Sequence, residues 1–126
     1  MTLSVETRKE IADTILAQLG GRQFKVMTGA KDFTFGERGE LTFGLPARFA
    51  KDGINKVRVT LTDADDYTLE FFRINMRAKE MVKTIATEEG VFVDTLRATF
   101  TRVTGLDCTL GSGGVVRSAV GNRGPF

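Results

Sequence analysis

Three closely spaced carboxylates, those of Asp63, Asp65 and Asp66, are the densest acidic group in the chain. Several oxygen ligands at short spacing are what a divalent cation such as calcium requires. The calcium-binding loop also needs a glycine at its bend and a glutamate at its end, and neither follows here. Aspartates readily hydrogen-bond their own backbone in turns. We therefore interpret the cluster as a hairpin turn with Asp65 in the left-handed conformation, and we expect no metal site.

The segment from Met27 to Lys31 combines a hydroxyl, a glycine and a lysine, which phosphate-binding loops also contain. It lacks the spacing of a P-loop, in which four residues separate the first glycine from Gly-Lys-Ser/Thr. No strand-to-helix unit of a parallel sheet is predicted around it. We interpret the segment as a connecting turn, with anion contact through Lys31 as the alternative.

Residues that commonly perform catalysis are scarce in this chain. It has no histidine, one cysteine and three serines. Cys108 lacks a histidine partner, and the neighbouring Asp107 raises rather than lowers the pKa of a thiol. The adjacent carboxylates Glu88 and Glu89 fall at the predicted start of a helix, where negative charge is favourable for electrostatic reasons alone. The sequence therefore predicts a protein that is not an enzyme and has no cofactor.

The elements that must position the remaining candidate residues begin with a helix over residues 4–19, which has apolar residues at three- and four-residue spacing. Residues 23–28 alternate apolar and polar side chains, which predicts a strand with Lys25 on its solvent side. Residues 31–45 predict a hairpin. Its three-residue loop ends in Gly39, where a left-handed residue is needed.

A second hairpin is predicted from residues 54–61 and 67–75. Pairing Leu61 with Tyr67 places Arg58 opposite Glu70, and it matches apolar with apolar residues on the buried face. Residues 81–87 predict the fifth strand, and residues 90–104 predict a second helix with helical apolar spacing.

The whole chain is predicted to be one α+β domain of two layers, in which N-terminal and C-terminal helices pack on one face of a five-stranded antiparallel sheet. Its 126 residues fit one core, and 41% of them are apolar. The domain covers residues 1–106. Residues 107–126 are predicted to form a Gly-rich C-terminal tail or arm. No apolar stretch approaches the roughly 18 residues that a membrane-spanning helix needs, so we expect no membrane association.

The predicted solvent face of the sheet mixes cations with apolar groups. Single-stranded nucleic acid is often held by such a face, because cations follow the phosphates and aromatic rings stack on the bases. The candidate nucleic-acid-binding residues are Lys25, Lys31, Lys56, Arg58 and Phe72. Arg58 also has a purely structural role open to it, as the cross-strand partner of Glu70.

The same face offers a second interpretation, in which apolar groups and the tail bind a protein or a second copy of this chain. The candidate interface residues are Phe72, Ile74, Arg117 and Arg123. Charge does not decide between the two, because the net charge is only +2. Residues 22–58 carry eight bases and four acids, whereas residues 59–90 carry four bases and seven acids.

The stretch from Ile15 to Lys31, with the sequence ILAQLGGRQFKVMTGAK, resembles a family of small uncharacterised bacteriophage and prophage proteins. The resemblance continues through residues 41–46, 54–61, 67–72 and 90–106. It implies a viral or mobile-element origin, and a place in the host cytoplasm or in the virion. It implies no catalytic chemistry, and the Gly-rich end of this chain departs from the family.

Together these observations favour a small non-enzymatic accessory protein of phage type that binds nucleic acid, single-stranded first, through the outer sheet face. The alternatives are a protein-binding factor that inhibits or regulates a host system, and a component of virion assembly or structure. No signal peptide is predicted, and with a single cysteine the sequence favours a cytoplasmic protein.

Overall fold

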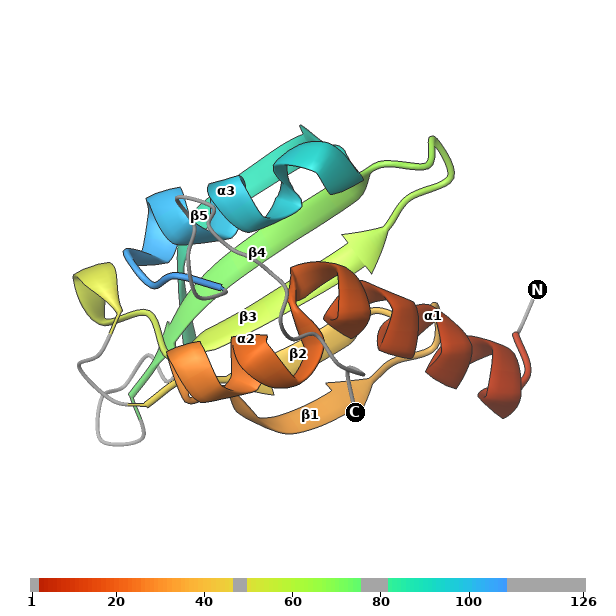
Figure 1. Cartoon of the computed structure of the whole chain (residues 1–126), viewed down its shortest axis with the longest axis horizontal. Helices are drawn as coiled ribbons and strands as arrows, with labels where there is room; N and C mark the ends of the chain where they lie inside the picture. Colours follow the sequence, from red (N-terminus) through yellow and green to blue (C-terminus); the bar gives the residue numbers. More distant parts are fainter. Residues whose placement is uncertain (1–2, 47–49, 76–81, 109–126) are drawn as a thin grey trace.

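The computed structural model describes residues 3–46, 50–75 and 82–108 (Figure 1). Along the chain its elements are α1 (Val5–Leu19), α2 (Gly21–Thr28), β1 (Lys31–Phe35), β2 (Leu41–Gly44), the short 3-10 helix η1 (Lys51–Gly53), β3 (Lys56–Leu61), β4 (Tyr67–Ile74), β5 (Val82–Val91) and α3 (Val93–Thr104).

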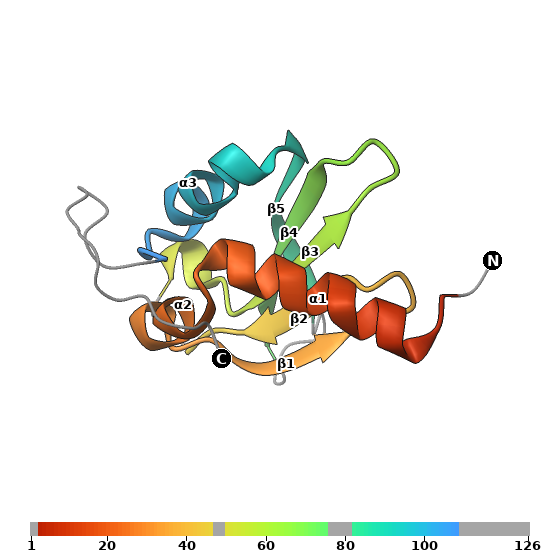
Figure 2. The same cartoon turned by 45° about the vertical axis from the view of Figure 1, so that its right-hand side comes forward.

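The five strands form one antiparallel sheet in the order β1-β2-β3-β4-β5, so each strand pairs with its neighbour in sequence. Figures 1 and 2 show α1, α2 and α3 together on one face of this sheet. The expected two-layer α+β fold is thus confirmed, with one more helix than expected. The arrangement leaves the opposite face of the sheet without a described helix over it, and we call this the outer face.

Both predicted hairpins are confirmed. In the first, the Gly36 amide donates to the Glu40 carbonyl at 3.1 Å, and Gly39 has a φ of 79°. A Cβ on Gly39 would lie 2.7 Å from the Cβ of Ile11, so glycine also allows this loop to pack against α1. In the second, Leu61 lies opposite Tyr67, as expected.

The turn of the second hairpin is closed by hydrogen bonds between its own residues. Asp65 has a φ of 64°, and its amide donates to the Thr62 carbonyl at 3.1 Å. The Thr62 amide donates to the Asp66 carbonyl at 2.9 Å, and the Thr62 hydroxyl donates to the Asp66 carboxylate. The predicted left-handed position of Asp65 is confirmed.

The prediction of a strand over residues 23–28 is wrong, because this segment is α2. Phe24 and Thr28 are buried one helical turn apart, whereas Val26 is 75% exposed. The positive φ values of Gly20 and Gly21 allow the chain to end α1 and begin a new helix at once. Lys25 therefore lies on the helical layer and not on the sheet.

The core lies between the two layers and is dominated by phenylalanine. The ring of Phe24 lies 5.3 Å from that of Phe43 and 5.2 Å from that of Phe100, both edge to face. Phe71 joins the cluster through Phe100, with 6.4 Å between the ring centroids. One ring each from α2, β2, α3 and β4 thus ties the helices to the middle of the sheet.

The fifth strand is longer than expected and continues to Val91, so the predicted helix start at residue 90 is wrong. Glu88 and Glu89 consequently belong to β5. Glu88 forms an ion pair with Arg102 of α3, with 3.0 Å between Glu88 Oε1 and the Arg102 guanidinium. Irregularities interrupt the pairing of β5 with β4 at two places, and such bulges discourage a further strand from adding to this edge.

The end of α3 matches its prediction, with Gly105 at a φ of 81° and Leu106 folded back into the core. The packed domain reaches further than residue 106, because Cys108 is also buried and lies 3.7 Å from the Arg97 carbonyl. The rest of the expected tail, residues 109–126, lies outside the described residues.

Candidate nucleic-acid interface

Two rows of directly opposed residues cross the outer face from β1 to β5, and they follow from the strand register. Directly opposed residues share a face of the sheet. The two rows lie on the same face because they are two residues apart in β2, β3 and β4, and irregularities in the pairing of β1 and β5 separate them by three residues there. The first row is Lys31, Gly44, Lys56, Phe72 and Thr84, and the second is Thr34, Thr42, Arg58, Glu70 and Thr87. The rows together carry three cations, one carboxylate and four threonine hydroxyls.

Four of the five residues predicted to bind nucleic acid meet on this face. They are Lys31, Lys56, Arg58 and Phe72. Lys31 is exposed and Lys56 half-buried. Gly44 between them has no side chain, but Asp32 Oδ2 lies 3.9 Å from the place that a Cβ on Gly44 would take, so a carboxylate lies over this position. Neither lysine forms an ion pair with any residue in the described part of the chain. Their ammonium groups are therefore available to an anion.

Arg58 occupies the centre of the outer face and is held from two sides. Its Nε lies 3.1 Å from Glu70 Oε1, and its guanidinium lies 5.2 Å from the centroid of the Phe72 ring. The Nε atom is buried and the ion pair lacks the alignment of a hydrogen bond, although the side chain as a whole remains 40% exposed. The guanidinium of Arg58 thus lies over the Phe72 ring, and part of the side chain is accessible to solvent.

Phe72 does not have the exposure predicted for it. It lies on the expected face, but only 8% of its surface is accessible, because Arg58 stacks over its ring. A base cannot reach an aromatic ring that is covered in this way. Stacking on this face therefore has to use the guanidinium of Arg58.

The remaining candidates fall elsewhere. Lys25 is on α2, where its Nζ lies 5.1 Å from the centroid of the Phe33 ring. Ile74 is half-buried at the edge of the outer face, opposite Val82, which is 55% exposed and was not predicted. Arg117 and Arg123 lie outside the described residues.

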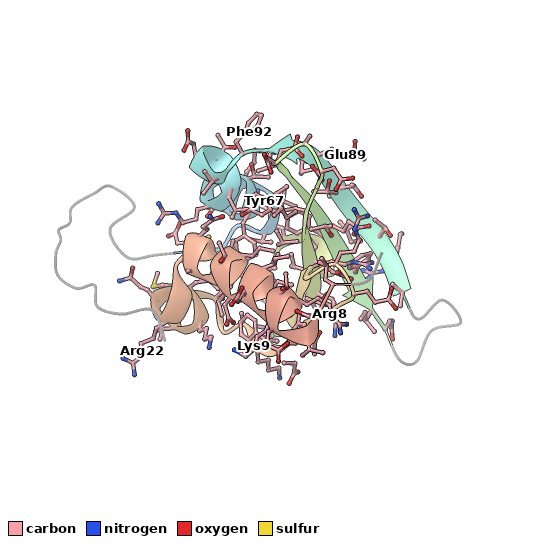
Figure 3. The ribbon with its side chains drawn as sticks, turned by 90° about the vertical axis from the view of Figure 1, so that its right-hand side faces the viewer. Arg8, Lys9, Arg22, Tyr67, Glu89 and Phe92 are labelled. Carbon is pink, nitrogen blue, oxygen red and sulfur yellow. The ribbon has the colours of Figure 1, made fainter. Side chains whose placement is uncertain are left out.

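Large exposed apolar residues also occur away from the sheet face. Phe92 is 57% exposed and Val93 48% exposed at the start of α3. Figure 3 shows Phe92 at the opposite end of the view from Arg8 and Lys9 on α1. Among the described residues, the exposed apolar groups are thus distributed over the surface and do not gather on the outer face.

Cys108 has the environment of a structural cysteine. Burial raises the pKa of its thiol to about 11, and the charge of Asp107 adds to the rise, whereas the Thr101 hydroxyl and Arg97 oppose it. At neutral pH the group is a thiol, which is a poor nucleophile.

Within residues 3–46, 50–75 and 82–108, no three His, Cys, Asp or Glu side chains gather closely enough to hold a metal ion. In the same ranges, none of the helices has the length and apolar character that crossing a bilayer requires.

Comparisons of the chain with protein-family models, with curated proteins and with solved structures found no match. The resemblance to phage and prophage proteins therefore stays a prediction.

Proposed function

We propose that this chain is a small non-enzymatic accessory protein of bacteriophage type that binds nucleic acid through its outer face. The observation that carries the proposal is the composition of the two rows, which join Lys31, Lys56 and Arg58 with threonine hydroxyls. Two carboxylates lie among them, Glu70 beside Arg58 and Asp32 over Gly44. Ammonium, guanidinium and hydroxyl groups are the donors that contact phosphate oxygens in nucleic-acid complexes.

The spacing of the cations suits a phosphate backbone. Lys31 and Lys56 are two strands apart in one row, which corresponds to roughly 10 Å across the sheet. Arg58 follows Lys56 on the same face of β3. A backbone that crosses the strands can therefore meet three cations, with the Asp32 carboxylate beside Gly44 between the two lysines.

Single-stranded nucleic acid is favoured over a duplex by the arrangement of Arg58. Its guanidinium lies 5.2 Å from the centroid of the Phe72 ring, and 40% of the side chain is exposed. Bases stack on arginine planes as well as on aromatic rings, and only an unpaired base can lie flat on this surface. Phe72 then acts beneath Arg58 by supporting the guanidinium with its ring.

The experiment is a fluorescence anisotropy titration with a labelled single-stranded oligonucleotide and the matching duplex, at about 50 mM and about 200 mM salt. The unmodified protein should bind the single strand more tightly than the duplex, and more weakly at the higher salt. The variant Lys56→Gln with Arg58→Gln should bind at least tenfold more weakly, with a salt dependence reduced by about two contacts.

The matched control is Arg22→Gln with Arg97→Gln, which removes the same charge from exposed positions on α2 and α3. Its affinity should stay within about twofold of the unmodified protein, since those cations do not lie on the outer face. Thermal melting of both double variants checks that they fold. Absence of binding at the lower salt, or equal weakening in the two double variants, contradicts the proposal.

A protein partner is the second candidate, and the pairing of Ile74 with Val82 favours it. These two apolar side chains lie directly opposite each other at the edge of the outer face, and Val82 is 55% exposed. If this edge binds a partner, Val82→Lys should abolish the interaction while leaving oligonucleotide binding intact.

A further inference from the structure

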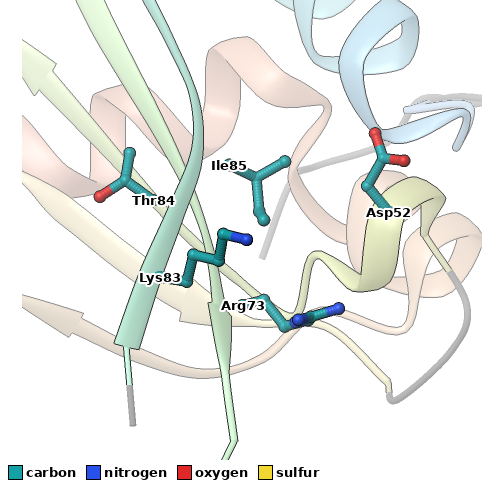
Figure 4. Close-up of a pocket in the computed structure, with 5 residues that line it drawn as sticks. All are labelled: Asp52, Arg73, Lys83, Thr84 and Ile85. Carbon is teal, nitrogen blue, oxygen red and sulfur yellow. The ribbon is translucent and has the colours of Figure 1, made fainter. Parts of the chain in front are cut away.

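A second basic site lies on the helical side of the sheet, where β4 and β5 face η1. An open hollow of about 420 Å³ is lined by Asp52, Arg73, Lys83, Thr84 and Ile85. Figure 4 shows Arg73 and Lys83 reaching into it from neighbouring strands, with Asp52 on the far side. None of these residues belongs to the proposed nucleic-acid interface except Thr84, which is at its edge.

Two like charges stand directly opposite each other in this hollow. Arg73 and Lys83 are register partners in β4 and β5, so their backbones are adjacent and their side chains share a face. Like charges in this position destabilise a sheet. No carboxylate among the described residues lies within ion-pair distance of either one, Asp52 included. The repulsion is therefore not relieved within the described part of the protein.

The side chain of Arg73 is also held in place. A Cβ on Gly53 would lie 2.7 Å from Arg73 Cδ, so the arginine stem packs directly on the backbone of η1. Gly53 itself has a φ of 73°, which a larger residue adopts only with strain. The stem of Arg73 is thus fixed against η1, whereas the residue as a whole is exposed to solvent.

From this we infer that the hollow between β4, β5 and η1 binds a phosphate group, which Arg73 and Lys83 hold together. A dianion between the two cations removes their repulsion, and the guanidinium offers two parallel donors to phosphate oxygens. The volume accommodates a phosphate with a further group attached. Asp52 on the far side can accept a hydrogen bond from a hydroxyl or amino group on that attached part.

Inorganic pyrophosphate is the probe for this site. Its binding is followed by calorimetry and by amide shifts in a ¹H–¹⁵N spectrum at low salt. Saturable binding with shifts at residues 52–53, 72–74 and 83–85 is expected. Arg73→Gln and Lys83→Gln should each weaken it at least tenfold, whereas Arg97→Gln should leave it within about twofold. No saturable binding, or equal loss in the Arg97→Gln control, overturns the inference.

Melting temperatures supply a second readout that does not depend on detecting the complex. Without ligand, Arg73→Gln and Lys83→Gln should melt at or above the temperature of the unmodified protein, because each removes the cross-strand repulsion. Pyrophosphate should raise the melting temperature of the unmodified protein only. If both variants melt lower and pyrophosphate stabilises all three proteins alike, the two cations serve another role and the inference fails.

The phosphate can belong to a small molecule or to a nucleic-acid backbone, and the labelled single-stranded oligonucleotide distinguishes the two. If Arg73→Gln with Lys83→Gln loses pyrophosphate but keeps the oligonucleotide, the site takes a small phosphorylated molecule. If it loses both, the site takes a backbone phosphate. Failure of the oligonucleotide to bind at all contradicts the proposed function and leaves the pyrophosphate result unaffected, so the two proposals fail separately.

Discussion

Two cross-strand pairs of charged residues, both involving β4, differ in sign. Arg58 and Glu70 are oppositely charged, 3.1 Å apart, and covered on one side by Phe72. Arg73 and Lys83 are both cationic, and neither forms an ion pair in the part of the chain that the structure describes. The first pair is explained by the stability of the sheet alone. The second is not, and this difference is why we assign it to an anion.

The two pairs also expose their cations to a ligand in different ways. Arg58 is oriented by its neighbours, so it offers a flat surface with only part of its charge unneutralised. Lys83 and Arg73 offer the full charge of both groups in an open hollow. A stacked, half-neutralised arginine suits bases and a repeating backbone, whereas an unneutralised pair suits a compact dianion.

Removing the common support of both pairs should have the largest effect. Phe100 is fully buried and contacts the rings of Phe24, Phe43 and Phe71, the last of which lies between Glu70 and Phe72 in β4. Phe100→Ala should lower the free energy of unfolding by about 3–5 kcal/mol. Chemical denaturation measures this, and both ligand titrations should be lost in parallel. Loss of only one would show that the two surfaces do not share this core.

An alkaline titration should have the next largest effect, through two buried acids. Burial raises the pKa of Cys108 to about 11 and also raises the pKa of Tyr67. Both groups keep their proton longer in the folded chain than in the unfolded one. The stability they contribute is therefore complete below about pH 9 and is lost as the pH rises towards 11.

For Cys108 the loss should be about 2–3 kcal/mol, because burial raises the pKa of the thiol from 9.0 to about 11. Denaturant unfolding at several pH values from 8 to about 11 measures the slope. Cys108→Ala should flatten that slope and leave the smaller part due to Tyr67. An unchanged slope in this variant would show that Cys108 does not cause the loss of stability at alkaline pH.

The register of both hairpins could be predicted from the sequence because two independent signals agree there. Side chains alternate with period two, and a left-handed residue, Gly39 or Asp65, occupies the last loop position. α2 could not be predicted in the same way. Its buried Phe24 and Thr28 are four residues apart, and a spacing of four fits both a strand and a helix in so short a segment.

The candidate site was predicted in outline and missed in detail. Alternation alone places Lys56, Arg58 and Phe72 on one face, but it does not tell that Arg58 stacks over Phe72 and buries it. The second basic site had one visible signal, since Arg73 continues the buried face of Leu69 and Phe71 with a charge. Its pairing with Lys83 depends on the irregularity in β5, which no local pattern announces.

Reversing one charge in each cross-strand pair should change the stability by smaller amounts, in opposite directions for the two pairs. Glu70→Lys makes the first pair like-charged and should cost about 1 kcal/mol of stability, because it also leaves the buried Arg58 Nε facing a cation. Denaturation of this variant beside Glu89→Lys, an exposed β5 residue with the same charge change, measures the local effect. Equal losses in the two variants would mean that net charge, not the pair, is responsible.

The smallest effect is expected from Lys83→Glu, which makes the second pair complementary. It should raise the free energy of unfolding by about 0.5 kcal/mol, as exposed cross-strand ion pairs do. Differential scanning calorimetry resolves a change of this size in the melting temperature. A clear loss of stability would show that Lys83 has a structural partner, and would weaken the contrast between the two pairs.

The most direct test of the central claim is to record ¹H–¹⁵N spectra while a single-stranded oligonucleotide is added. If nucleic acid binds the outer face, amide shifts should concentrate in β2, β3 and β4 around Thr42, Lys56 and Arg58, and α1 and α2 should stay unchanged. Shifts confined to the helices, or no shifts at the lower salt concentration, would contradict the assignment of this face.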